Sequence, residues 1–357
     1  MYEGLSKEDS NALKGIAICL LLVHHLFPDK DTIAGLGVQT LILSSKHLLE
    51  AAYFAKICVP IFVFVTAYGI ATKFAAEEAL NKELIEKTVA RRLKALMIPY
   101  WYVFILFQII CNITGARTYA ERYCVKGGGL RSVVYFVTDF LGLADFFGTP
   151  TLNKTWWYMT LALLLVFSIP LMYALVKKFG WIVLPAFCLM FIPMNYRPYM
   201  LTALMAITMC RYGTVEKLQK KLGNSMARII AFAAVDIALL AISCYLRNRF
   251  DDEKGWNTVV FLGAAFLTVS LYAVLLKRIP AFTKVFGAIG RHSMSIFLTH
   301  TFIFEVLFRR FIYSFRYAVL IWLALLLTSL ALAIVLERSR ELLERVFNAT
   351  LLPHLSH

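Results

Sequence analysis

Long apolar segments separated by polar connections are the feature that most limits how this chain folds. Ten such segments occur, at about residues 12–27, 55–74, 95–114, 156–176, 181–193, 199–212, 226–246, 256–276, 294–313 and 317–336. A helix needs roughly 20 apolar residues to cross the hydrocarbon core of a bilayer. The sequence therefore predicts an all-α integral membrane protein with a bundle of about ten transmembrane helices. The short fifth and sixth segments alternatively form one broken hairpin.

The composition agrees with this fold class. The chain is 60% hydrophobic and 17% charged, whereas soluble domains are about 45–50% apolar and about 25% charged. These values exclude a disordered chain, a collagen-like repeat and an ordinary soluble enzyme. Residues 1–10 are polar and acidic, so the first apolar segment is expected to remain as a span and not to be cleaved as a signal peptide. We expect one membrane domain over residues 1–357, with a cytoplasmic C-terminal tail at 337–357.

The formal net charge of +15 indicates the orientation of the chain in a membrane and not nucleic-acid binding. Lys and Arg residues flank the apolar segments and form no single stripe, which is typical of polytopic membrane proteins in contact with anionic lipid. We therefore expect membrane lipid and no nucleic acid among the partners. Counting these residues beside the spans favours a cytoplasmic N-terminus and a cytoplasmic C-terminus.

The seven cysteines show no CxxC pair and no Cys/His spacing suited to a metal ion. The sequence predicts no structural disulfide, no metal site and no bound cofactor. Two polar stretches stand out between the apolar segments. Residues 76–94 have a helical charge pattern and are expected to continue into the third span. The connection at 115–155 is too long for a turn, so we expect a surface-lying or re-entrant element there.

Two positions in the first apolar segment form the first candidate site. Lys14 and His25 are eleven residues apart, so on a helix they face the same direction within about 20° and lie about 16 Å apart along the axis. This face carries a cation near one end and an imidazole near the other. A lysine that reaches the interface and an interfacial histidine would give the same pattern.

A second candidate site lies in the segment 290–301. Ser293 and His300 are seven residues apart and share a helix face within about 20°. His300 is well inside an apolar run, where a buried histidine bonded to a neighbouring helix is the alternative. Histidines in two spans without metal-ligand partners favour acid–base chemistry.

A third candidate site is a basic cluster before the third span. Arg91, Arg92 and Lys94 precede Pro99, which can tilt the helix entry. Three cations at this position can bind phosphate or pyrophosphate groups. They can equally serve only to orient the chain in the membrane.

In this order the motifs resemble acyltransferase family 3, the integral-membrane acyltransferases that modify polysaccharides and other surface glycans. The stretch from Lys14 to His25 resembles the family's Arg-x10-His, with lysine in place of arginine. Further similar segments are 59–69 (aromatic-rich), 91–100 (basic residues, then Pro-Tyr), 154–159 (Lys-Thr-Trp-Trp-Tyr-Met) and 289–300 (Gly-Arg-His-Ser to His). The resemblance covers residues 11 to about 336.

The resemblance implies a multi-pass protein of the bacterial inner or plasma membrane that transfers an acyl group from acyl-CoA, with acetyl-CoA as the first expectation. The acceptor would be a hydroxyl of a cell-surface glycan or of its lipid-linked precursor. In this interpretation His25 is the general base and His300 orients the acceptor or polarises the thioester. The substrate-binding and CoA-binding residues are Lys14, Arg91, Arg92, Lys94, Trp157 and Ser293.

A secondary transporter or lipid-linked sugar translocator is the alternative function. Asp236 and Glu305 would then be coupling carboxylates inside the membrane. In an enzyme they would instead be hydrogen-bond or ion-pair partners between helices. The sequence shows no pair of Gly/Pro-broken helices at matching positions in two halves, which argues against an inverted-repeat transporter.

Overall fold

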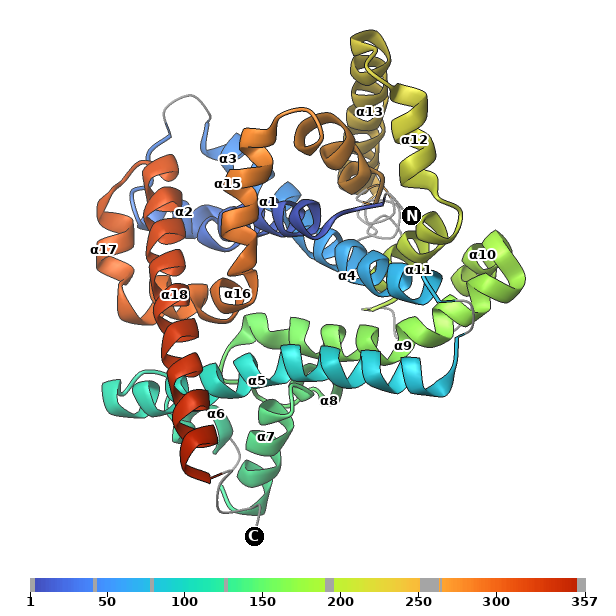
Figure 1. Ribbon diagram of the computed structural model, residues 1–357. Helices are drawn as coiled ribbons and strands as arrows, with labels where there is room; N and C mark the ends of the chain where they lie inside the picture. The colour runs from blue at the N-terminus through green and yellow to red at the C-terminus, as the bar shows by residue number, and fades with distance from the viewer. Residues whose placement is uncertain are drawn as a thin grey trace. The chain divides into compact units, whose positions relative to one another are not determined.

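A computed structural model describes residues 4–40, 44–77, 80–124, 128–189, 196–250, 263 and 265–351. These residues form helices and contain no β-strand (Figure 1). The predicted all-α class is confirmed. Residues 190–193 of the predicted fifth segment, and residues 256–262 and 264 of the predicted eighth segment, lie outside the described residues.

Among the described residues, four helical stretches are long and apolar enough to cross a membrane: residues 45–75, 82–114, 154–187 and 318–346. A shorter apolar helical stretch covers 293–307. The four stretches support a membrane protein, and the ten spans with both termini cytoplasmic stay a prediction. The first apolar segment forms helix α1 (Lys7–Leu26), which is shorter than these four stretches.

The chain divides into two compact units, which we describe separately. The first contains residues 1–24, 50–93 and 161–291. At its core, α4 (Cys58–Ala75) packs along α11 (Arg197–Arg211), and most side chains of both helices are buried. The other helices of this unit include most of α1, the second half of α3 (Ser45–Phe54), the start of α5 (Lys82–Thr114), most of α9 (Trp157–Phe179), α10 (Val183–Leu189), α12 (Thr214–Leu222), α13 (Met226–Phe250), the π-helix at Leu271–Leu276 and α15 (Pro280–Arg291).

Within this unit, α1 and α15 approach so closely that their backbones touch. A Cβ atom built on Gly15 would lie 1.9 Å from the carbonyl oxygen of Phe286, and one on Gly290 would lie 1.8 Å from that of Asn11. Only glycine fits at either position. Small residues that let two helix backbones meet are typical of membrane proteins. Both glycines belong to the sequence motifs that contain the candidate site residues.

The second unit contains residues 25–49, 94–160 and 292–357. Its centre is α16 (Ser293–Phe302), which continues into a π-helix at Ile303–Leu307 and packs against α18 (Ala318–Leu351). The remaining helices are α2 (Lys30–Gly35), the first half of α3 (Ser45–Phe54), most of α5, α6 (Tyr119–Tyr123), α7 (Leu130–Phe140), α8 (Ala144–Phe147), the 3-10 helix at Lys154–Trp156 and α17 (Arg309–Ser314).

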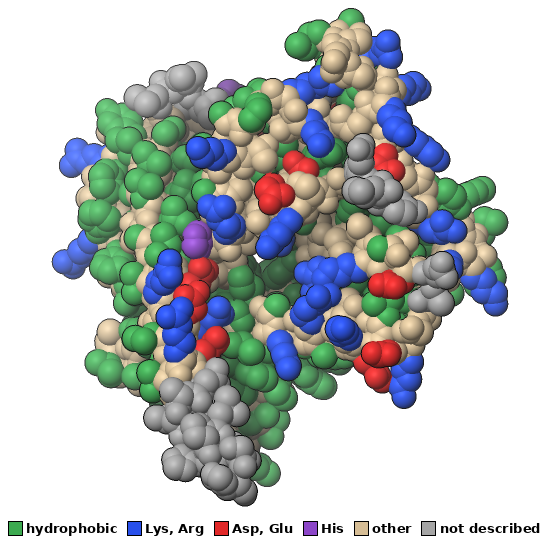
Figure 2. Space-filling model, viewed as in Figure 1, with side chains coloured by type: hydrophobic (Ala, Val, Ile, Leu, Met, Phe, Trp, Pro, Cys, Tyr) green, Lys and Arg blue, Asp and Glu red, His purple; other side chains and the backbone are tan. Residues whose placement is uncertain are grey.

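Helices of the second unit expose large apolar side chains along one face. On α5, Ile98, Ile105, Ile109 and Ile113 are between 41% and 79% exposed and recur at helical spacing. Figure 2 shows green hydrophobic side chains over the region of α17, where Phe308, Phe311 and Phe315 are exposed. Exposed apolar faces of this extent on long helices fit contact with lipid.

The polar stretch before the third span and the long connection both form helices. The polar residues from Lys82 onward and the apolar third segment form the single helix α5, with Pro99 inside it. The 115–155 connection folds into α6, α7 and α8. Helix α7 is amphipathic, with its apolar face exposed at Leu130, Val133, Val134 and Val137. Helix α18 runs to Leu351 and so includes much of the predicted tail.

Candidate functional site

Two histidines from different helices meet in the second unit. His25 lies in the last turn of α1 and His300 lies in α16, and their ring centroids are 5.1 Å apart with the rings inclined at 43°. These are the two positions predicted to be catalytic. They are 275 residues apart in the sequence, so their contact is a product of the fold.

Hydrogen bonds to the backbone fix the orientation of the His300 ring. The side chain is fully buried, and Nδ1 lies 2.8 Å from the carbonyl oxygen of Phe297 and 3.2 Å from that of Ile296. Carbonyl oxygens only accept hydrogen bonds, so Nδ1 carries the proton. In the neutral ring Nε2 is then the acceptor. No hydrogen-bond partner for Nε2 is present among the described residues.

The neighbouring His24 has a different environment. Its Nδ1 lies 2.9 Å from the carbonyl oxygen of Ala52, to which it donates. This hydrogen bond attaches α1 to α3, which gives His24 a structural role. Of the two adjacent histidines, His25 is the one that contacts His300.

Side chains just before α9 support the helix that carries His300. Trp156 donates from Nε1 to the carbonyl oxygen of Leu298 at 3.1 Å. The buried Asn153 donates from Nδ2 to Thr301 Oγ1 at 2.5 Å. Leu298 and Thr301 flank His300 in the sequence, so these two bonds hold the turn of α16 from which the imidazole projects.

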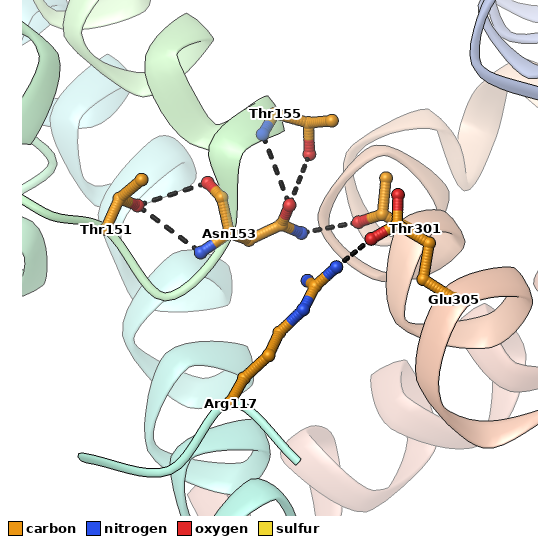
Figure 3. Close-up of polar contacts among 6 residues, drawn as sticks. All are labelled: Arg117, Thr151, Asn153, Thr155, Thr301 and Glu305. Atoms are coloured by element: carbon orange, nitrogen blue, oxygen red, sulfur yellow. Dashed lines mark hydrogen bonds and ion pairs between the residues drawn. The ribbon is translucent and has the colours of Figure 1, made fainter. Parts of the chain in front are cut away.

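Asn153 is itself held by its neighbours, as Figure 3 shows. Its Oδ1 accepts hydrogen bonds from the backbone nitrogen of Thr155 at 3.2 Å and from Thr155 Oγ1 at 3.0 Å. Thr151 Oγ1 accepts a hydrogen bond from the backbone nitrogen of Asn153 at 3.3 Å. Because both Oδ1 and Nδ2 of its side chain are hydrogen-bonded, Asn153 has a fixed orientation and holds Thr301 in place.

An ion pair closes the other side of this helix (Figure 3). Arg117 donates to Glu305, one turn beyond Thr301, and its guanidinium lies 5.4 Å from the centroid of the Phe302 ring. Burial lowers the pKa of Arg117, which lies between α5 and α6. Glu305 therefore has an ion-pair partner, as the enzyme interpretation expects.

The basic residues gather separately, in the first unit. Arg92 on α5 is close enough to Lys14 on α1 and to Lys73 on α4 for their like charges to interact, and Arg91 also acts on Lys73. Arg92 lies beside Gly69, where a Cβ atom would be 3.8 Å from its Nη2. Its buried Nε has no hydrogen-bond partner among the described residues. A group of cations with an unused buried donor is suited to binding an anion.

The remaining predicted residues occupy three different places. Lys94 is exposed on α5, one turn after Arg91. Trp157 begins α9 and lines a cavity with Trp156. Ser293 begins α16 and is half-buried, but the polar contacts nearby belong to its neighbours: Ser295 Oγ donates to Glu337 at 2.6 Å, and His292 Nδ1 lies 2.6 Å from the same carboxylate.

Several residues around the site were not predicted from the sequence. Thr301 directly follows His300, and its position in an apolar helix was the available signal. Asn153, Arg117 and Lys73 lie at helix ends or in a connection, where polar side chains are ordinary and give no such signal. Among the described residues, no group of three or more His, Cys, Asp or Glu side chains is placed to bind a metal ion.

Comparison with known proteins decides the family. Residues 8–338 match the model of the family Acyl_transf_3, described as an acyltransferase domain. The chain belongs to acyltransferase family 3. The comparisons with curated proteins and with solved structures found no match. The resemblance predicted from the sequence motifs is confirmed over nearly the whole chain.

Membership of this family, together with the apolar helices, makes the protein a membrane acyltransferase. The transporter alternative loses its basis, because Glu305 is engaged by Arg117 and the family is one of enzymes. Asp236, the other carboxylate of that alternative, is buried on α13 beside Ser270 in the first unit. Neither Asp236 Oδ2 nor Ser270 Oγ has a hydrogen-bond partner among the described residues, and a role for Asp236 as a polar contact between helices stays a prediction.

Proposed function

We propose that the acyltransferase moves an acyl group, in the first instance acetyl, from acyl-CoA to a hydroxyl of a cell-surface glycan or its lipid-linked precursor. The contact between His25 and His300 is the observation that carries this proposal. A neutral imidazole is suited to remove a proton from a hydroxyl as the C–O bond forms. A partner ring with a fixed acceptor nitrogen can orient the groups that take part.

In the proposed reaction His25 is the general base. It takes the proton of the acceptor hydroxyl while the hydroxyl oxygen attacks the thioester carbonyl carbon. The C–O bond forms, the C–S bond breaks, and the sulfur leaves with the bonding electrons. His25 then gives the proton to that sulfur, so the products are the ester and the free thiol of CoA.

The orientation of His300 supports a positioning role over an electrophilic one. With Nδ1 donating to Phe297, the neutral ring offers only a lone pair at Nε2. A lone pair can accept a hydrogen bond from the acceptor hydroxyl or from His25. It cannot donate to the thioester carbonyl oxygen, so of the two roles expected for His300 we favour orientation of the acceptor.

The phosphate groups of acyl-CoA are assigned to the basic residues. Lys14, Lys73 and Arg92 would bind them in the first unit, with Arg91 contributing charge. Lysine at position 14 provides a single ammonium where the family pattern has a guanidinium, so its contact would depend less on planar geometry. Lys94 remains a predicted contributor.

The reaction itself is tested with the purified full chain in lipid nanodiscs. Acetyl-CoA, propionyl-CoA and longer acyl-CoAs are supplied with and without a bacterial polysaccharide preparation, and free thiol is measured. We expect thiol release that increases with the acceptor and a matching ester on the glycan. Ester formation from a donor other than acyl-CoA, with no thiol released from any acyl-CoA, would refute the donor assignment.

Neutralising Arg92 is expected to weaken donor binding. Charge-assisted hydrogen bonds to phosphate contribute about 1.5–3 kcal/mol, so Arg92→Gln should raise the KM for acyl-CoA by about tenfold or more. Lys82→Gln on the same helix is the matched control, because the Lys82 side chain is 88% exposed and pairs only locally with Glu86. An equal KM in both variants would leave Arg92 with an orienting role alone.

A further inference from the structure

A cavity of about 410 Å³ lies in the second unit between α7, α8 and the start of α9. Among the described residues, its lining comes from residues 139–157, within the long connection between the third and fourth apolar segments and the start of the fourth. None of the chemistry assigned above uses this cavity. Trp157 is the one predicted substrate-binding residue in its wall.

The wall of the cavity is rigid because it is built around one buried carboxylate. Asp139 is 1% exposed and accepts hydrogen bonds from Tyr123 at 2.7 Å, from Thr151 at 2.8 Å and from the backbone nitrogen of Leu152 at 2.6 Å. Burial raises the pKa of Asp139, while these three donors act in the opposite direction. The network attaches α7 to the chain that leads into α9 and so fixes the shape of the cavity.

The lining combines aromatic surface with short polar groups. Trp156 and Trp157 supply indole rings, Thr149 and Thr151 supply hydroxyls, and Asp145 and Lys154 supply exposed charges of opposite sign. A pyranose has the complementary chemistry, since its C–H groups form an apolar face and its rim consists of hydroxyls. Indole faces bind such C–H groups, and carboxylate, hydroxyl and ammonium groups exchange hydrogen bonds with sugar hydroxyls.

The charges of the lining argue against the other substrates of a membrane acyltransferase. Among the described lining residues, two carboxylates, on Asp139 and Asp145, stand against the ammonium of Lys154. This balance disfavours the phosphates of CoA and also disfavours acidic sugars. An acyl chain has no hydrogen-bonding groups to offer the threonine hydroxyls and charged side chains of the lining, so it is less complementary than a saccharide.

The cavity wall is directly connected to the turn of α16 that carries His300. Trp156 lines the cavity and donates to Leu298, while the adjacent Asn153 donates to Thr301. An occupant that presses on the Trp156 wall therefore acts on the helix turn that holds the imidazole. This connection favours an acceptor over a ligand unrelated to the reaction.

We propose that this cavity is a binding subsite for an uncharged saccharide unit of the acceptor, with Trp157 as its principal contact. That the bound saccharide is the acyl acceptor rests on the proposed function. Binding of the saccharide to this cavity does not depend on catalysis. Trp157 and Lys154 are the residues that determine which sugar enters, and Trp156 relays its presence to α16.

Binding is tested by saturation-transfer difference NMR on the full chain in nanodiscs, with cellobiose and di-N-acetylchitobiose as probes. We expect signal transfer to the sugar C–H protons in the wild type and weaker transfer to methyl glucuronide. Trp157→Ala should reduce the transfer about fivefold or more. Trp181→Ala should leave it unchanged, since Trp181 is 63% exposed and belongs to the other unit.

Lys154→Met provides a second variant, because Lys154 is exposed and its replacement does not disturb the core. We expect it to weaken the transfer to both disaccharides, and a wild-type signal in both Trp157→Ala and Lys154→Met would overturn the proposal. No transfer to either disaccharide in the wild type would overturn it as well. Saccharide binding without thiol release from acyl-CoA would instead reject the proposed function and leave the subsite intact.

Discussion

His25→Ala is expected to lower the rate of acyl transfer by about 10²–10⁴-fold, the usual contribution of a general base, whereas His24→Ala should retain most of the activity. His25 contacts His300, while His24 donates to the backbone of Ala52. The two variants change the same residue type at adjacent positions of one helix. Turnover at saturating acyl-CoA, normalised to the protein in the membrane fraction, measures the difference.

The reverse pattern would exchange the assignments. If His24→Ala abolished transfer while His25→Ala kept wild-type turnover, the family spacing from Lys14 would select the wrong histidine. Thermal stability of both variants in detergent serves as the control. A general base should be removable without a large loss of stability, whereas loss of the Ala52 contact should lower the stability of His24→Ala.

Gly290→Ala is expected to destabilise the folded protein by about 3 kcal/mol or more, the upper part of the range for overpacking. The added Cβ would lie 1.8 Å from the carbonyl oxygen of Asn11 and 2.7 Å from the backbone nitrogen of Gly15, so α1 and α15 must separate. Helix propensity alone predicts the opposite sign, because alanine is favoured over glycine by about 1 kcal/mol within a helix. The melting temperature of the purified variant distinguishes the two effects: we expect it to fall, whereas helix propensity alone would raise it.

Gly287→Ala is the matched control on the same helix. The nearest atom to its added Cβ is the carbonyl oxygen of Glu8 at 3.9 Å, an ordinary contact. We expect Gly287→Ala to be neutral or slightly stabilising. Equal melting temperatures for Gly287→Ala and Gly290→Ala would contradict the close approach of the two helices.

The sequence predicted the helical class and the residues of the histidine pair, since both depend on local patterns. Apolar segments of span length define the helices, and His25 and His300 are polar residues in apolar surroundings, which is costly unless they have a role. The contact between them was not predicted, because the family resemblance gave each residue a role without placing the two side chains together. Nothing in the local sequence brings residues 275 positions apart together.

The number of membrane-spanning helices was harder to predict from the sequence. The ninth segment was predicted as one span over 294–313, but α16 passes into a π-helix and ends before Arg309, where α17 begins. The mean hydropathy of a segment does not reveal such a break, because apolar residues continue on both sides of it. The last apolar segment has the opposite property, because α18 continues through charged residues to Leu351. A charged helical extension and a polar tail have similar compositions.

Supporting residues were the hardest to predict. Asn153 and Arg117 derive their roles from partners on α16, and each stands in a region rich in polar side chains. Lys73 resembles any lysine at the end of an apolar helix until α4 is packed against its neighbours. Gly15 and Gly290 lie within the segments that resemble the family motifs. The sequence alone, however, does not indicate which helix backbone packs against a glycine in a membrane helix.

A double-mutant cycle on His25 and His300 tests the central claim most directly. Wild type, His25→Ala, His300→Gln and the double variant are compared for ester formation from acetyl-CoA, with each protein purified and reconstituted in nanodiscs. Residues that act as one unit lose function non-additively. We predict that each single variant loses most of the activity and that the double variant is about as active as His25→Ala alone. Losses that multiply across the cycle, or wild-type turnover in either single variant, would contradict a catalytic pair.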